Sequence, residues 1–145
     1  MARHRSPRCP SLTVAAAVAL LLAGCATEFT PSSGGDGYSE TQLSPTSFQV
    51  TFRGNTKTTP ERAHDFALLR AAEIALSNKC AHFAVISATA GDNGTAGMMI
   101  NSSFIAKKKP EVSLSVRIYP AKPSGDALEA AYVRKSIRAK YQIPE

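Results

Sequence analysis

The sequence predicts an α+β fold, a two-layer sandwich in which a small sheet of about four strands carries two helices on one face. Two patterns predict it. Residues 47–53 and 112–119 alternate apolar with polar side chains, as strands with one buried face do. Residues 60–77 and 126–141 repeat apolar side chains every three or four positions, as amphipathic helices do. In chain order, the expected elements are strand, helix, three strands and helix.

The first helix is indicated by its cap and by its apolar face. Thr59 is a suitable N-cap, and Pro60 fits the first helical position, where a missing N–H costs nothing. Arg70 and Glu73 lie three residues apart, which is the spacing of an ion pair on a helix. Small and apolar residues share the face expected to pack on the sheet: Leu68, Ala71, Ala72 and Ala75.

Three further strands are expected between the two helices. Residues 81–88 are apolar on both sides, as in a central strand. Gly91–Thr95 has the composition of a turn, 98–106 is a weaker strand, and Lys107–Pro110 is a charged connection to the strand at 112–119. The sheet face away from the helices is expected to be polar and open: Gln49, Thr51, Arg53, Ser113, Ser115, Arg117 and Tyr119.

The chain begins with a predicted secretory signal, residues 1–24. Three arginines precede an apolar run at residues 12–23. The run is shorter than the roughly 18 apolar residues that a membrane-spanning helix needs. It ends in Leu22-Ala23-Gly24-Cys25, which matches the bacterial lipobox: an apolar residue, two small residues and cysteine. Cleavage is therefore expected between Gly24 and Cys25, with an ordinary cleaved secretory signal as the alternative.

Acylation of Cys25 would attach the chain to a membrane. Each buried CH₂ group contributes about 0.8 kcal/mol, and two or more acyl chains give stable attachment. Ala26 stands where enteric-type sorting places Asp to retain lipoproteins in the inner membrane, so the expected location is the outer membrane, facing the periplasm. Residues 25–37, rich in Ser, Gly and Pro, are expected to form a flexible tether, and 38–145 a single domain.

Charge and cysteine content narrow the class of protein further. Three arginines leave with the signal while all 11 acidic residues stay, so half of the formal net charge of +6 is lost and nucleic-acid binding is not expected. With Cys9 removed and Cys25 acylated, Cys80 remains alone, and no intramolecular disulfide is expected. Cys80 is expected to be a small buried residue.

Three motifs stand in order along the chain: Tyr38-Ser39-Glu40-Thr41-Gln42-Leu43, Val50-Thr51-Phe52-Arg53-Gly54-Asn55 and Leu68-Leu69-Arg70-Ala71-Ala72-Glu73. Together they resemble a family of small, uncharacterised proteobacterial outer-membrane lipoproteins. The resemblance covers residues 37–120, and it implies an envelope lipoprotein domain with no assigned activity. It therefore carries no catalytic residue over to this sequence.

The sequence contains no catalytic constellation, so neither an enzyme nor a cofactor nor a metal is expected. Cys80 and His82 lie two residues apart on an expected strand, which would place their side chains about 7 Å apart and parallel. With His64 they do not have the spacing of a structural zinc site. No acid is in place to orient His82 in a nucleophilic pair. A small periplasmic enzyme that uses Cys80 and His82 is kept as an alternative.

Three features are candidates for binding a partner. Arg53 and Arg117 lie on the open sheet face, where a guanidinium can bind a carboxylate through two hydrogen bonds, although Glu40 is an alternative partner for either. Residues 38–45 are expected to form a lead-in loop that ends in a turn before the first strand. Phe66 projects among polar residues of its helix, either as cover for this loop or as a partner-binding residue. The last helix carries a basic strip which, with Lys107–Lys109, could meet anionic lipids or cell-wall carboxylates: Arg134, Lys135 and Arg138.

The sequence therefore predicts a lipid-anchored envelope lipoprotein that is a non-enzymatic interaction or structural module. Its expected partners are the membrane, through acylated Cys25, and an envelope protein or the cell wall. A passive peptidoglycan or lipopolysaccharide binder is the third hypothesis.

Overall fold

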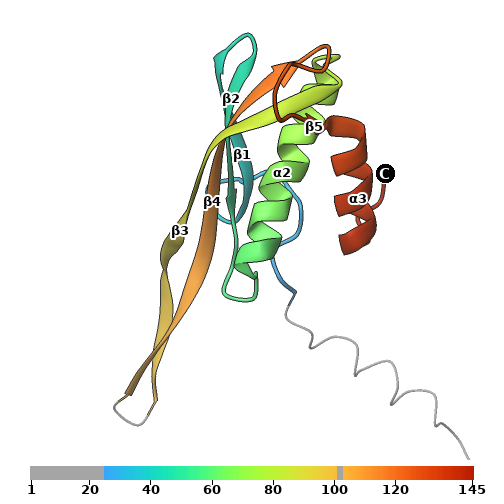
Figure 1. The fold of residues 1–145 in the computed structure, drawn as a ribbon. Coiled ribbons are helices and arrows are strands. Elements are labelled where there is room, and N and C mark those ends of the chain that lie inside the picture. The colour runs from blue at the N-terminus through green and yellow to red at the C-terminus, as the bar shows by residue number, and fades with distance from the viewer. Residues whose placement is uncertain (1–24, 101–102) are drawn as a thin grey trace, which may run out of the picture.

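The computed structural model describes residues 25–100 and 103–145. Figure 1 shows an open antiparallel sheet with both helices on the same side of it: the first helix packs on the sheet, and the second packs on the first. This confirms the predicted α+β fold. In chain order the elements are β1 (Gly37–Ser44), β2 (Ser47–Arg53), α2 (Pro60–Ser77), β3 (His82–Ile100), β4 (Ser103–Tyr119), β5 (Leu128–Glu129) and α3 (Ala130–Tyr141). The strand order across the sheet is β1-β2-β4-β3-β5.

The core lies between α2 and the two neighbouring strands β2 and β4. The alternation that predicts these strands is the alternation of their burial, because every second side chain faces the helix. The strand residues in the core are Phe48, Val50, Phe52, Val112, Leu114, Val116 and Ile118. Helix α2 buries mostly small side chains, so its backbone can approach the sheet closely; its buried alanines are Ala63, Ala67, Ala71, Ala72 and Ala75.

Helix α2 begins where its sequence indicates. The Thr59 hydroxyl oxygen accepts a hydrogen bond from the Arg62 N–H at 3.2 Å, and Pro60 occupies the first turn. The ion pair expected within the helix is present, with 3.2 Å between Arg70 Nη1 and Glu73 Oε2. Local capping chemistry and the apolar period therefore suffice to define this helix.

The strands after α2 differ from the prediction. Gly91–Thr95 is not a turn, and Lys107–Pro110 is not a connection, because both lie inside the long strands β3 and β4. The turn-forming residues make a β-bulge in β3: the register of β3 against β4 shifts between Asp92 and Thr95, and Gly94 has a φ of 82°. The three strands expected here are thus two long ones.

The far ends of β3 and β4 leave the sheet together (Figure 1). β2 pairs with β4 as far as Glu111, and beyond that residue β4 pairs with β3 alone among the described strands. The paired residues 92–100 and 103–110 are called the β arm. The single strand expected at 98–106 is wrong, because residues 98–100 belong to β3 and residues 103–106 to β4. Residues 101 and 102 lie outside the described part.

Two further elements were not expected as strands. β1, predicted as a lead-in segment ending in a turn, is an antiparallel partner of β2. β5 pairs with the start of β3, and α3 begins at Ala130 instead of Asp126. Because β1 and β5 join the sheet, it has five strands instead of about four. The apolar stripe predicted for the last helix does pack on the core: Ala130, Val133, Ile137 and Tyr141.

The N-terminal segment 25–37 packs on the domain, whereas its composition predicts a flexible tether. Thr27 is 8% exposed. Its N–H donates to Thr58 Oγ1 at 3.0 Å, and its Oγ1 accepts from the Asn55 N–H at 2.7 Å. Asn55 Nδ2 also donates to the Cys25 carbonyl oxygen at 3.2 Å. Composition shows that the segment has little apolar surface of its own, but not that the domain offers it hydrogen-bond partners.

The expected acylation site, Cys25, is exposed at the start of the described chain. The predicted signal, residues 1–24 with Gly24 at its end, lies outside the described residues. Within 25–100 and 103–145, neither helix is long and apolar enough to cross a bilayer.

Candidate functional site

A cleft of about 590 Å³ lies on the helical side of the molecule. Its walls come from α2, the end of α3, Tyr38 of β1 and two segments without regular structure, residues 28–30 and 142–145. Small-molecule sites typically occupy about 300–1,000 Å³. The cleft is therefore large enough to hold a ligand, and parts of the chain far apart in sequence build it.

Aromatic rings form the apolar wall of the cleft, with Phe66 at their centre. Its ring centroid lies 5.6 Å from that of Phe29, 5.1 Å from that of Phe52 and 5.0 Å from that of Tyr141, in each case edge to face. Tyr38 adds a further ring, 4.6 Å from Phe29. Edge-to-face pairs of this kind contribute about 0.5–1.5 kcal/mol each beyond the area that they bury.

Two guanidinium groups form the polar wall. Arg62 lies over the rings of Phe66 and Tyr141, at 5.0 and 5.1 Å from their centroids. The side chain of Arg138 is 14% exposed and donates through Nη1 to the Pro144 carbonyl oxygen. The Nε atoms of Arg62 and Arg138 are buried, and neither has a hydrogen-bond partner among the described residues. Buried donors without a partner are uncommon in folded proteins, and here the neighbouring atoms close both Nε atoms off from solvent.

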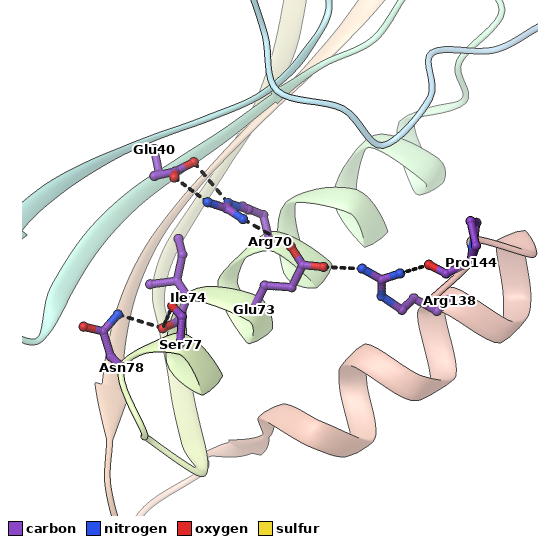
Figure 2. Close-up of polar contacts among 8 residues, drawn as sticks. All are labelled: Glu40, Arg70, Glu73, Ile74, Ser77, Asn78, Arg138 and Pro144. Carbon is purple, nitrogen blue, oxygen red and sulfur yellow. Dashed lines mark hydrogen bonds and ion pairs between the residues drawn. The ribbon is translucent and has the colours of Figure 1, made fainter.

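A chain of ion pairs connects the cleft to the sheet (Figure 2). Arg70 Nη2 lies 2.6 Å from Glu40 Oε1 on β1, and Arg138 Nη2 on α3 lies 2.7 Å from Glu73 Oε1 on α2. Arg70 and Glu73 join the two pairs. The hydrogen bond with Glu40 is the main reason that the pKa of Arg70 is raised above its ordinary value. The network thus ties β1, α2 and α3 together beside the cleft.

Two tyrosines of the cleft are held in the neutral form. Burial raises the pKa of Tyr38, whose ring also lies 4.6 Å from the Arg70 guanidinium carbon. Burial likewise raises the pKa of Tyr141, and a hydrogen bond of 2.8 Å from its hydroxyl to Asp65 Oδ2 adds to the effect.

These shifts predict a loss of stability in alkali. A raised pKa in the folded state gives stability that is complete below the ordinary tyrosine pKa of about 10 and is lost as the pH rises through the folded value. The free energy of unfolding is therefore expected to fall above about pH 10, and to fall less steeply in Tyr38→Phe/Tyr141→Phe.

Absorbance of tyrosinate in a pH titration tests this directly, since the chain has four tyrosines and no tryptophan. Tyr38→Phe and Tyr141→Phe should each remove one equivalent from the late part of the titration. A late part that is unchanged in both variants would contradict the partly buried positions of these rings.

The arginines expected on the open sheet face lie on the other side of the sheet from the cleft. Arg53 Nε donates to Glu111 Oε2 at 2.8 Å, and Arg117 is exposed. Glu40 pairs with neither, so its expected role as their partner is wrong, because Glu40 faces the helices and binds Arg70. The open face is polar as predicted, and hydrogen bonds cross it between β2 and β4: Thr51–Ser113 and Gln49–Ser115.

Of the candidate binding residues predicted on the helices, most are buried or paired. Phe66 is fully buried, so a partner-binding role for its ring is wrong. Arg138 is paired with Glu73, and Arg134 Nη2 lies 2.9 Å from Glu145 Oε2, while Lys135 is exposed. The three residues therefore do not form a continuous basic strip. Phe66 and Arg138 do come together, as two walls of one cleft.

Sequence reasoning misses Arg62 as a residue of the site. One signal for it was available, because Arg62 and Phe66 are four residues apart on one helix and so lie on the same side. A second signal, for the position of the site, lies in two of the three sequence motifs. The first motif contains Tyr38 and Glu40 and the third contains Arg70 and Glu73, and these residues build the network beside the cleft.

Cys80 and His82 lie away from the cleft. Cys80 is buried, as predicted. His82 Nδ1 is buried and has no hydrogen-bond partner among the described residues. In the described ranges, no three His, Cys, Asp or Glu side chains are grouped closely enough to hold a metal ion.

Comparison with protein-family models, with curated proteins and with solved structures finds no match to this chain. The family resemblance of the three motifs therefore stays a prediction.

Proposed function

We propose that this protein is a bacterial envelope lipoprotein, acylated at Cys25 and held at the periplasmic face of the outer membrane, and that it binds a peptide segment of a partner protein in the cleft. The module is non-enzymatic: it recognises main-chain oxygens with its arginines, and apolar side chains with the partly exposed rings of Phe29, Tyr38 and Tyr141. The buried position of Cys80 gives no support to the alternative of an enzyme that uses Cys80 and His82.

One observation carries the choice of a peptide ligand. Residues 142–145, which have no helical or strand structure, line the cleft, and the Pro144 carbonyl oxygen accepts a hydrogen bond from Arg138 Nη1. Polypeptide main chain is thus a ligand that the cleft already accommodates. A partner peptide would supply the same oxygens to the guanidinium group of Arg62, which lines the cleft and is half-buried.

The charge around the cleft favours a peptide over a simple anion. Glu28, Glu73 and Glu145 line it together with Arg62 and Arg138, so the cleft is not a basic pocket. A peptide, which presents both donors and acceptors, suits such a mixed lining better than a phosphate does.

Anchoring at Cys25 is supported by its sequence context and by its exposure. Because residues 28–30 form one wall of the cleft, the binding site begins three residues after the acylated cysteine. A partner is therefore expected to be captured close to the membrane surface.

Site-specific photo-crosslinking in living cells tests the proposal. A photo-reactive amino acid at Gln142, which is exposed and lines the cleft, should capture one dominant envelope protein. The same probe at Lys135 or Arg117, both exposed and outside the cleft, should not. Arg62→Gln in the Gln142-probe protein should strongly reduce the adduct, because it removes a guanidinium and leaves the probe in place.

Acylation is measured in the same cells. Labelled palmitate should be incorporated, and Cys25→Ser should abolish both the label and recovery in the membrane fraction. An adduct from Arg117 alone would place binding on the open sheet face and contradict the cleft. No adduct from any position in cells where Cys25 is acylated would contradict the interaction module itself.

A further inference from the structure

The chain turns back on itself where α3 ends, and residues 142–145 then form one wall of the cleft. The helix ends at Tyr141, and Gln142 follows in the left-handed region, with a φ of 55°. Beyond this reversal, the Ile143 N–H donates to the Arg138 carbonyl oxygen at 3.0 Å. The 142–145 segment is therefore laid along the cleft from the end of the helix.

The 142–145 segment contacts the molecule as a bound peptide would. Ile143 is half-buried and packs on the hydrophobic core. The Pro144 carbonyl oxygen accepts from Arg138 Nη1, and the Glu145 carboxylate lies 2.9 Å from Arg134 Nη2. An apolar side chain, a main-chain acceptor and a carboxylate thus follow one another along three residues.

These contacts hold the segment only weakly. The side chain of Glu145 is 79% exposed and that of Arg134 is 37% exposed, and ion pairs between exposed side chains contribute little to stability. Pro144 is exposed and has no N–H to donate. Gln142 has a backbone conformation that residues other than glycine rarely adopt. Little stabilisation is therefore lost when the segment leaves the cleft.

The helix that carries the segment is held more firmly. The Tyr141 hydroxyl donates to Asp65 Oδ2 on α2 at 2.8 Å. Figure 2 shows Arg138 between its two partners, and its Nη2 lies 2.7 Å from Glu73 Oε1, also on α2. Release of residues 142–145 would therefore leave α3 in place, and would leave Arg138 Nη1 beside the cleft without its acceptor.

We propose that the 142–145 segment is a built-in occupant of the cleft, and that a partner binds by displacing it. The partner peptide then carries the same groups in the same order: an apolar side chain, a main-chain oxygen for Arg138 and a carboxylate for Arg134. The inference rests on the peptide-binding function proposed above, and adds to it a class of ligand and a means of regulation. A tethered occupant competes at an effective concentration of about millimolar, so the partner needs further contacts, such as one with Arg62.

Fluorescence anisotropy with a labelled synthetic peptide of the sequence of residues 141–145 tests the inference on the full protein, purified from cells in detergent. The unchanged protein should bind this peptide weakly, because its own segment competes. Glu145→Lys places a cation beside Arg134 and should release the segment. The apparent affinity should then rise about tenfold, as it does when the open fraction of clefts goes from about a tenth to nearly all. Asp126→Lys, an equal charge change at an exposed residue outside the cleft, should leave the affinity unchanged.

A reciprocal change of charge shows whether the peptide takes the place of the segment. A peptide that carries Glu145→Lys should not bind to the Glu145→Lys protein, since its lysine meets Arg134. Arg134→Glu should reverse this preference: the new carboxylate repels the protein's own Glu145, and the peptide with lysine should bind where the unchanged peptide does not. A variant that merely loses its fold would bind neither peptide, and cannot exchange the two preferences.

Failure of this inference and failure of the proposed function give different results. Equal affinities of the unchanged protein and Glu145→Lys for the unchanged peptide would overturn the inference, as would a preference that Arg134→Glu does not reverse. If the probe at Gln142 captures an envelope protein and Glu145→Lys does not raise the yield of the adduct, the function stands and displacement is wrong. If the peptides behave as expected and the probe captures no protein, the built-in occupant stands and the proposed partner is wrong.

Discussion

Replacing Phe66 with alanine is expected to lower the free energy of unfolding by about 3–5 kcal/mol, the range measured for buried phenylalanines in other proteins. The ring is fully buried and has edge-to-face contacts with Phe29, Phe52 and Tyr141. Its loss would leave a cavity that the surrounding rings can fill only in part. It would also remove one of the two rings on which Arg62 lies.

Urea unfolding followed by circular dichroism measures this effect. Phe66→Leu should cost clearly less, because it keeps most of the apolar volume. Tyr132→Ala, at a residue that is 70% exposed on α3, is the surface control and should change stability by no more than about 0.5 kcal/mol. Equal effects of Phe66→Ala and Tyr132→Ala would show that the ring is not in the core.

Replacing Glu73 with alanine is expected to have the second largest effect, a loss of about 2 kcal/mol. Its carboxylate binds Arg70 and Arg138 at once, and its side chain is only 17% exposed. Removal leaves two guanidinium groups without their shared counter-charge. Breaking a fully buried pair costs about 3–5 kcal/mol, and the partial exposure of these three side chains reduces the figure.

A double-mutant cycle isolates the contribution of the pair. Glu73→Ala, Arg138→Met and the double variant are compared, and coupling of about 1 kcal/mol or more is expected for residues in one network. Glu73→Gln should retain part of the stability, since it keeps one oxygen as an acceptor. Purely additive effects would mean that α2 and α3 are held together by apolar packing alone.

Local patterns were sufficient to predict the central strands and α2. The alternation in 47–53 and 112–119 places Val50 and Leu114 in the core because one sheet face is covered. The cap formed by Thr59 depends only on the residues next to it in sequence. They were not sufficient for β3. Gly91–Thr95 has the composition of a turn, and only its long-range pairing with β4 makes it a bulge inside a strand.

The site was harder to predict than the fold. A helical period places Phe66 on the polar side of α2, and nothing in that period shows that Phe29 and Tyr141 cover this side from opposite ends of the chain. The helical period of the last helix likewise places Arg138 away from the apolar stripe, and so predicts an exposed charge. Its partners Glu73 and Pro144 belong to another helix and to the C-terminal residues, which only the tertiary fold brings to it.

The packed N-terminal segment has a consequence for how an anchored protein would search for a partner. A free tether of the length of residues 25–37 would let the domain sweep a hemisphere with a radius of about 20 Å. Hydrogen bonds between the start of the chain and the residues Asn55 and Thr58 remove that reach. If Cys25 is acylated as proposed, only lateral diffusion and rotation about the membrane normal would remain. The search would then be two-dimensional, and a partner would have to come to the membrane surface and present its peptide at a fixed height.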